Sequence, residues 1–249
     1  MQHPTPLTGQ VILITGGTRG IGQAIAKRLL ADGADIAICG RHPRGVDAAV
    51  QDLAANCDGA EVSKVRGKVA DVTKHEQVED LFRWVDEQFG GLDVLVNNAG
   101  AGLFRPLREL SVDEWKTTIE TNLSGAFYCS REALFRFGTR KRGYIVNISS
   151  LAGKHAFAQG AAYNASKFGL NGFTEALMQE LRSENVRVSN VMPGSVATGF
   201  GGNEITGLDW RIWPEDVAEV VHMLLTMPPR TLISAVELRP SKPPQSVKK

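Results

Sequence analysis

Short apolar runs alternate with longer amphipathic segments along the chain, and this alternation limits the folds that it can form. Seven apolar runs are predicted strands: residues 11–15, 34–39, 62–70, 92–97, 143–149, 186–192 and 231–238. Six segments of helical periodicity lie between them: residues 21–31, 45–56, 74–89, 111–137, 161–183 and 214–226. Continuous apolar strands separated by helices are typical of βαβ units around a buried parallel sheet. The pattern predicts an α/β protein.

The length and charge of the chain narrow its class further. We predict one domain over residues 1–240, followed by a Pro/Lys-rich tail over residues 241–249. The 28 basic residues nearly balance the 27 acidic ones, so no global charge favours nucleic acid or an anionic membrane as a partner. The sequence shows neither a leader pattern nor an apolar run of roughly 18 to 20 residues, which predicts a cytoplasmic protein without membrane association.

Several other site chemistries find no support in the sequence. No G-x-S-x-G elbow is present and the five histidines are scattered, so nothing favours a serine hydrolase. Cys39, Cys57 and Cys129 lack the paired spacing of a zinc or redox site, and we expect them to be reduced. No metal site is predicted. His155 is expected to be an exposed loop residue.

A glycine-rich turn, TGGTRGIG at residues 15–22, follows the first predicted strand and opens a helix. Its glycines would let backbone N–H groups approach a pyrophosphate at the helix N-terminus. The spacing of Gly16, Gly20 and Gly22 differs from the G-x-G-x-x-G dinucleotide fingerprint. A tight connection without a ligand therefore remains an alternative on this motif alone.

The residue after the second predicted strand indicates which dinucleotide would bind. A carboxylate there would hold the ribose 2′-hydroxyl of NAD and repel the phosphate of NADP. This chain instead has Arg41 after Gly40, and Arg19 lies within the glycine turn. Two guanidinium groups suit a phosphate dianion, so NADP(H) is the predicted cofactor in preference to NAD(H). The alternative is that both arginines are solvated surface charges.

Tyr163 and Lys167 stand four residues apart in YNASK, within a segment of helical periodicity. Residues four apart share one face of a helix, so both side chains should project toward one site. A nearby ammonium favours the phenolate and predicts a Tyr163 pKa below its ordinary value of about 10. Such a phenol would exchange protons readily. On this motif alone, an ordinary surface pair remains the alternative.

Together these motifs resemble the short-chain dehydrogenase/reductase family, including its 3-oxoacyl-reductase-like members. TGGTRGIG matches the family's TGxxxGxG, and NNAG at residues 97–100, VNISS, YNASK and PGSVAT at residues 193–198 follow in the family's order. The resemblance implies a Rossmann-type doubly wound sheet in the order 3-2-1-4-5-6-7, with helices on both faces. It also implies an NADP(H)-dependent oxidoreductase that interconverts a carbonyl and a secondary alcohol.

The resemblance assigns roles to particular residues of this chain. Ser150 would orient the substrate oxygen, Tyr163 would act as general acid/base, Lys167 would hold the nicotinamide ribose, and Asn122 would hold a water linked to Lys167. Ser149 is the weaker alternative to Ser150. The implied cofactor-binding residues are Gly16, Thr18, Arg19, Gly20, Ile21, Gly22, Arg41, Asp71, Val72, Asn98, Ala99, Gly100, Tyr163, Lys167, Pro193, Gly194, Val196 and Thr198.

The sequence says less about the substrate and about the oligomeric state of the protein. A short glycine-rich segment follows PGSVAT, and the candidate apolar lining of an open cleft is Phe104, Leu151, Phe157, Met192, Phe200 and Trp210. Small or apolar residues in the predicted helices 111–137 and 161–183 favour a homodimer or homotetramer. Two other functions stay open: a cofactor-binding sensor or scaffold without turnover, and a sugar-nucleotide epimerase or dehydratase.

Overall fold

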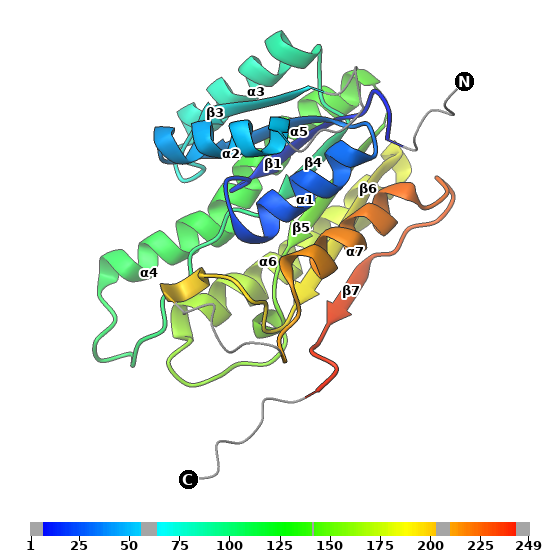
Figure 1. Cartoon of the computed structure of the whole chain (residues 1–249). Coiled ribbons are helices and arrows are strands. Elements are labelled where there is room, and N and C mark those ends of the chain that lie inside the picture. The colour runs from blue at the N-terminus through cyan, green and yellow to red at the C-terminus, as the bar shows by residue number, and fades with distance from the viewer. Residues whose placement is uncertain (1–6, 56–63, 141, 203–209, 243–249) are drawn as a thin grey trace.

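The computed structural model describes residues 7–55, 64–140, 142–202 and 210–242, which are arranged around one central sheet (Figure 1). Its strands are β1 (Val11–Thr15), β2 (Asp35–Gly40), β3 (Val65–Val69), β4 (Val94–Asn97), β5 (Gly143–Ile148), β6 (Val186–Pro193) and β7 (Ala235–Leu238). They pair in parallel in the order β3-β2-β1-β4-β5-β6-β7. The predicted fold class and strand order are confirmed.

Helices cover both faces of this sheet (Figure 1). They are α1 (Gly20–Ala31), α2 (Pro43–Ala55), α3 (His75–Phe89), α4 (Val112–Ile119), α5 (Gly125–Arg140), α6 (Ala161–Leu181) and α7 (Pro214–Thr226). Residues of α1, α2 and α7 share one core cluster, and residues of α3, α5 and α6 share another. The sheet therefore lies between two helical layers, as the resemblance implied.

The alternation of side chains along β1 shows why the strands are apolar throughout. Ile12 and Ile14 belong to the core cluster that contains α1 and α7, whereas Val11 and Leu13 belong to the opposite cluster. Successive side chains of a strand point to opposite faces, so both faces need apolar residues when helices cover both. Burying each such side chain contributes about 1.5–3 kcal/mol.

Two predicted elements differ from the structure. The predicted helix 111–137 is divided into α4 and α5 by a π-helical turn at Glu120–Ser124. The predicted strand 231–238 is shortened to β7 (Ala235–Leu238), and Thr231 instead belongs to a turn in which its N donates to Pro228 O at 2.8 Å. The other elements begin and end within a few residues of the predicted bounds, which is the usual uncertainty at element ends.

Some of the predictions concern residues outside the described ranges or stay untested. Residues 62–63 of the predicted strand 62–70 and residues 243–249 of the predicted tail lie outside the described residues. The single-domain assignment of residues 1–240 stays a prediction. Among the described residues, no helix combines the length and the apolar character that a membrane crossing requires.

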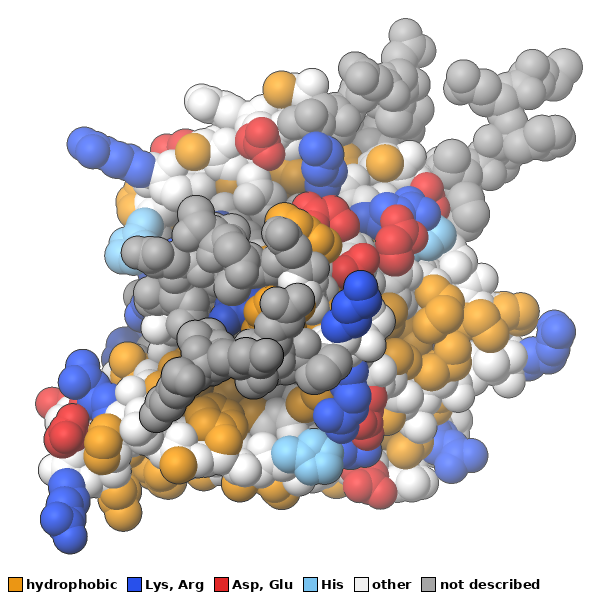
Figure 2. All heavy atoms as spheres, turned by 60° about the horizontal axis from the view of Figure 1, so that its bottom comes forward, with side chains coloured by type: hydrophobic (Ala, Val, Ile, Leu, Met, Phe, Trp, Pro, Cys, Tyr) orange, Lys and Arg blue, Asp and Glu red, His pale blue; other side chains and the backbone are white. Residues whose placement is uncertain are grey.

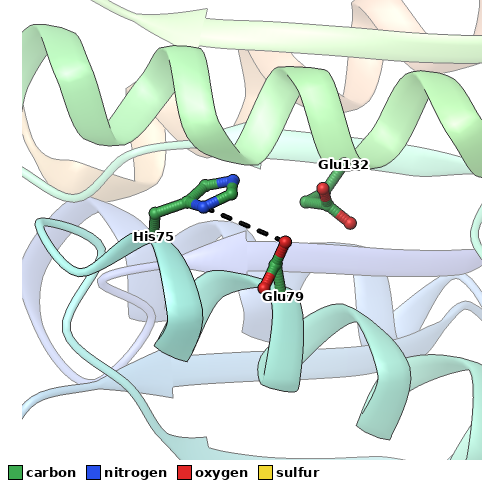
Figure 3. A group of neighbouring side chains, drawn as sticks. All are labelled: His75, Glu79 and Glu132. Carbon is green, nitrogen blue, oxygen red and sulfur yellow. Dashed lines mark ion pairs between the residues drawn. The ribbon is translucent and has the colours of Figure 1, made fainter.

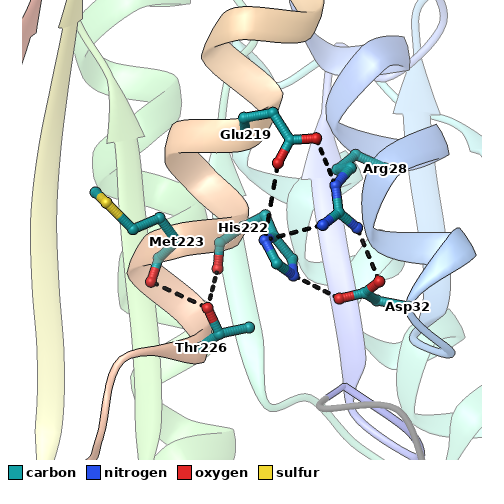
Figure 4. Close-up of polar contacts among 6 residues, drawn as sticks. All are labelled: Arg28, Asp32, Glu219, His222, Met223 and Thr226. Carbon is teal, nitrogen blue, oxygen red and sulfur yellow. Dashed lines mark hydrogen bonds and ion pairs between the residues drawn. The ribbon is translucent and has the colours of Figure 1, made fainter.

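A cluster of charged side chains joins α1 to α7 (Figure 4). Arg28 donates from Nε to Glu219 Oε1 at 2.7 Å and from Nη1 to Asp32 Oδ1 at 2.8 Å. His222 Nε2 contacts Asp32 Oδ2, and His222 Nδ1 lies 3.1 Å from Arg28 Nη2. Burial raises the pKa of Asp32, but hydrogen bonds from Arg28 and His222 outweigh it and hold this pKa below its usual value.

We expect Asp32→Asn to lower the free energy of unfolding at pH 7 by about 1 kcal/mol, because the cluster is partly exposed. The pKa of Asp32 is lower in the folded protein than in the unfolded chain. Its contribution to the free energy of unfolding is therefore complete above the unfolded pKa of about 4, and it is lost as the pH falls through the pKa of the folded protein. Urea denaturation at pH 7 and pH 3 measures both effects. Asp47→Asn, at an exposed position of α2, is the control. An equal loss of unfolding free energy in the two variants at pH 7 would contradict a stabilising role for Asp32 in this cluster.

Candidate functional site

The turn between β1 and α1 lets an anionic group approach its backbone. Gly16 and Gly20 have φ angles of 64° and 56°, in the left-handed region that favours glycine. A Cβ at Gly22 would lie 2.4 Å from both Asn98 Nδ2 and Gly16 O, so only glycine fits there. Helix α1 has no acidic residue in its first turn, so its N-terminal N–H groups favour an anion. This geometry fits the predicted pyrophosphate cradle.

Thr15 connects this turn to the end of β4, and sequence reasoning missed it. Its Oγ1 accepts hydrogen bonds from the backbone N–H groups of Asn98 and Ala99, both at 3.0 Å. The Asn98 side chain donates in return to Thr15 O and Gly16 O, both at 3.0 Å. A hydroxyl residue at a buried strand end, just before the glycine turn, was the available signal. These bonds fix the predicted residues Asn98 and Ala99 beside the turn.

The residues predicted to bind the adenosine end of the cofactor lie at and near the carboxyl ends of β2 and β3. Arg41 directly follows β2, and Arg19 is the residue before α1; both are exposed. A Cβ at Gly40 would lie 2.7 Å from Thr18 Cγ2, so the glycine turn packs closely on the end of β2. Asp71, after β3, accepts from Thr73 N at 3.0 Å through Oδ1. The structure thus places the predicted residues on adjacent strand ends.

The segment after β6 returns toward the glycine turn. Gly194 N donates to Leu238 O of β7 at 2.8 Å, which holds the start of this segment against the sheet. A Cβ at Gly20 would lie 3.4 Å from Thr198 Cγ2. The predicted residues of the glycine turn and of the segment 193–198 therefore border the same space.

Tyr163 lies in the first turn of α6, is 9% exposed, and has its hydroxyl beside the side chain of Ser150. Ser150 lies two residues after the end of β5, and its Oγ accepts from Ala152 N at 3.1 Å. Ser149 instead donates to Asn171 Oδ1 at 2.5 Å, away from this pair. The structure therefore brings together Ser150 and Tyr163 and leaves the alternative serine in a structural contact.

Lys167 lies one turn after Tyr163 on the same face of α6. Its Nζ donates to Ile148 O at 2.9 Å and lies 5.9 Å from the centre of the Tyr163 ring. Burial lowers the pKa of Lys167 to about 8. The expectation that its ammonium lowers the pKa of Tyr163 is wrong for this structure, because burial raises that pKa and the Ser150 hydrogen bond only partly offsets the rise.

Asn122 lies in the π-helical turn between α4 and α5, a feature often found at functional sites. Its Oδ1 accepts from Ala101 N at 2.7 Å, and its Nδ2 donates to Ala101 O and to Ser166 Oγ, both at 2.9 Å. Ser166 in turn donates to Tyr163 O at 2.7 Å. The side chain therefore ties the segment after β4 to α6, and its water-holding role stays a prediction.

Two aromatic side chains pack against Tyr163, and a third packs against one of them. The ring centres of Phe104 and Phe200 lie 5.4 Å and 5.8 Å from that of Tyr163, and Phe157 lies 5.6 Å from Phe104. Figure 2 looks toward the end of the molecule that lies at the bottom of Figure 1 and shows hydrophobic and charged side chains intermixed on it. These three phenylalanines are part of the predicted apolar lining.

The other predicted lining residues lie elsewhere. Met192 is 1% exposed and belongs to the buried part of β6. Leu151 lies in the short turn after Ser150, and a Cβ at Gly194 would come within 3.0 Å of its Cδ1. Trp210 lines a separate cavity. His155 is exposed, as predicted, and its Nε2 lies 3.1 Å from Arg239 Nη2.

Among the described residues, one group of side chains has ligand types suited to a metal: His75 and Glu79 on α3 with Glu132 on α5 (Figure 3). Their candidate ligand atoms all lie within 4.8 Å of one another. Arg136 Nη1 donates to Glu132 Oε2 at 2.7 Å, and Arg131 Nη1 lies 3.3 Å from His75 Nε2. Because guanidinium groups already supply positive charge to this group, we assign no metal to it.

Comparison with known proteins gives consistent matches. A family model described as short chain dehydrogenase matches residues 10–207. An uncharacterized oxidoreductase of Staphylococcus aureus is 31% identical over 236 residues, covering 95% of this chain and 99% of the relative. An alcohol dehydrogenase of the archaeon Thermococcus sibiricus, complexed with 5-hydroxy-NADP, has a TM-score of 0.86 and 30% identity, over 95% of this chain and 99% of that chain. A metagenomic short-chain oxidoreductase in complex with NADP has a TM-score of 0.83 and 37% identity, over 96% of this chain and 100% of that chain.

Proposed function

The chain belongs to the short-chain dehydrogenase/reductase family of NAD(P)-dependent oxidoreductases, and we propose that it reduces a carbonyl to a secondary alcohol with NADPH and with Tyr163 as the proton donor. The observation that carries this proposal is the buried side chain of Tyr163 beside Ser150, one helical turn from Lys167. This group lies at the carboxyl end of the sheet, where open α/β sheets bind their ligands.

NADPH, when bound, supplies the hydride, and the residues of this chain orient the substrate and supply the proton. Ser150 and Tyr163 would both donate hydrogen bonds to the carbonyl oxygen. As negative charge develops on that oxygen, the Tyr163 phenol transfers its proton to it. Lys167, held by Ile148 O, would place an ammonium near the developing charge and near the cofactor ribose.

The protonation state of Tyr163 indicates which half of the reaction this residue assists at neutral pH. Burial raises the pKa of Tyr163, so the phenol is protonated at neutral pH. A protonated phenol can donate a proton to a carbonyl, whereas alcohol oxidation would require the phenolate. We therefore propose that Tyr163 is in the protonation state that carbonyl reduction requires at neutral pH, and that the rate of alcohol oxidation increases as the pH rises toward the pKa of Tyr163.

The glycine turn supports a dinucleotide, and the two arginines support NADP in particular. A Cβ at Gly16 would lie 2.9 Å from Ala99 Cα, so the turn must stay free of side chains there. Arg19 and Arg41 are exposed at the turn and at the end of β2. Both can form charge-assisted hydrogen bonds with a ribose phosphate. The NADP complexes among the structural relatives agree with this preference.

The surroundings of Tyr163 support an apolar carbonyl substrate, because Phe104 and Phe200 pack against it. A cytoplasmic location is also part of the proposal. Cys39 and Cys129 are buried and unpaired, which fits a reducing compartment.

We expect Tyr163→Phe to lower kcat by about a hundredfold to ten-thousandfold, because a positioned general acid contributes about that much. The variant keeps the ring and should still bind NADPH, which cofactor fluorescence measures independently of turnover. Tyr128→Phe on α5 is the matched control and should retain activity. A Tyr163→Phe rate within threefold of wild type would contradict the proton-transfer role.

The cofactor preference is tested by Arg41→Asp. We expect the Kd for NADPH to rise about tenfold to a hundredfold, because a charge-assisted hydrogen bond contributes about 1.5–3 kcal/mol. The Kd for NADH should change much less, because NADH lacks the 2′-phosphate. Calorimetric titration with both cofactors gives the ratio of the two Kd values. The control is Arg230→Asp, which changes an exposed residue in a turn after α7. Equal weakening of both cofactors would argue against a phosphate contact.

We also propose a homodimer formed through α5 and α6. Phe127, Phe135 and Phe168 are 45%, 59% and 46% exposed on these helices, which is unusual for large apolar side chains outside an interface. Sedimentation velocity should show a dimer for the wild type and a monomer for Phe168→Glu. Met223→Glu, which changes a half-exposed apolar side chain on α7, should leave the dimer intact. Dissociation by Met223→Glu alone would place the interface on α7.

A further inference from the structure

A cavity of about 400 Å³ lies between the start of α7 and the segment that follows β7. Small-ligand pockets span roughly 300–1,000 Å³, so this volume admits a small molecule. Three cationic side chains and one carboxylate line it together with two indole rings: Trp210, Arg211, Ile212, Trp213, Asp216, Arg239, Pro240, Ser241 and Lys242. The lining therefore combines net positive charge with flat apolar surfaces.

Arg211 has unused hydrogen-bonding capacity in this cavity. Its Nε is buried and has no hydrogen-bond partner, and its guanidinium lies 5.3 Å from the centre of the Trp210 ring. The described residues provide no carboxylate partner for it. The described residues also provide no hydrogen-bond acceptor for its other N–H groups, so these groups can donate to an anion in the cavity.

Arg239 is fixed in the same cavity by its neighbours. Its Nη2 donates to Glu237 Oε2 at 3.1 Å and lies 3.1 Å from His155 Nε2. Glu237 also accepts from Lys154 Nζ at 2.5 Å, so two cations share one carboxylate. Among the described residues, these contacts of Arg239 are made through Nη2 alone. One edge of the guanidinium is therefore anchored, and its other N–H groups can serve a ligand.

Asp216, the one carboxylate of the lining, already serves a structural role. Its Oδ2 accepts from Trp213 N at 2.7 Å at the start of α7. Lys242 is exposed at the rim of the cavity. The local charge is therefore positive with the carboxylate bound to the backbone, which favours an anion over a cation.

The cavity wall is bonded to both segments that flank the Tyr163 site. Ile212 N donates to Ser195 O at 3.2 Å, and Ala197 N donates to Ile212 O at 2.9 Å, within the segment after β6. Arg239 contacts His155, in the loop that begins at Ser150. A molecule bound in the cavity would therefore touch elements that position the catalytic group.

We propose that this cavity binds a small organic anion, with its carboxylate or phosphate between Arg211 and Arg239 and its apolar body against Trp210 and Trp213. This site is separate from the glycine turn that would hold the cofactor pyrophosphate. The anionic group has two possible sources. It is either part of the carbonyl substrate, in which case the inference rests on the proposed function, or it belongs to a second small molecule.

Direct binding of phenyl phosphate tests the site without turnover. With NADPH at saturation, we expect phenyl phosphate to change the tryptophan fluorescence and phenol to have no effect. Arg211→Gln and Arg239→Gln should each raise the Kd at least tenfold, whereas Arg108→Gln, at an exposed loop position, should leave it unchanged. Trp210→Phe should reduce the signal if it arises in this cavity. Absence of binding, or binding that both cavity variants leave unchanged, would overturn the proposal.

A kinetic comparison distinguishes the two sources. The substrates are a pair of aryl ketones that differ only in a carboxylate remote from the carbonyl. If the substrate carries the anion, Arg211→Gln should raise KM for the acidic ketone at least tenfold more than KM for the neutral ketone. If a second molecule carries it, phenyl phosphate should change the rates with both ketones, and the effect should be lost in Arg211→Gln. Phenyl phosphate binding without reduction of either ketone would contradict the proposed function and still support the anion site.

Discussion

Buried hydrogen bonds at the carboxyl ends of β1, β4 and β5 hold the strand ends together, and the rest of the site depends on them. Thr15 Oγ1 accepts from Asn98 N, which joins β1 to the end of β4. Asn97 Nδ2 donates to Asn147 Oδ1 at 2.9 Å, and Asn147 Nδ2 donates to Thr174 Oγ1 of α6 at 2.8 Å. Each buried polar group would cost about 1–3 kcal/mol if unsatisfied, so these contacts favour one arrangement of the glycine turn and α6.

The same burial sets the chemistry of the two titratable groups on α6. It raises the pKa of Tyr163 and lowers the pKa of Lys167 to about 8, so it disfavours the charged form of both residues. A phenol kept neutral in this way donates its proton when negative charge develops on a substrate oxygen close by. Burial of the site and protonation of Tyr163 are thus parts of one arrangement, which supports the proposed carbonyl reduction.

The sequence predicted the sheet well because its strands are apolar on both faces, as β1 shows. Periodicity could not reveal the π-helical turn at Glu120–Ser124, because one wider turn hardly alters a helical pattern over 27 or so residues. Motif spacing placed Tyr163 and Ser150 together, as the structure does. The pKa of Tyr163 could not be predicted from the Lys167 spacing, because burial acts on both side chains and depends on Phe104 and Phe200, which lie far from Tyr163 in the sequence. Arg211 and Arg239, 28 residues apart, have no motif, and only the fold places them in one cavity.

The most direct measurement of the central claim follows the hydrogen transferred from the cofactor. The purified protein is incubated with NADPH that carries deuterium in both positions at C4 of the nicotinamide and with a neutral aryl ketone, and the product is analysed by mass spectrometry. We expect an alcohol with one deuterium at the carbinol carbon, and a hydroxyl proton that comes from water through Tyr163. Alcohol without deuterium, or bound NADPH that is never oxidised by any carbonyl tested, would contradict the assignment of this chain as a carbonyl reductase.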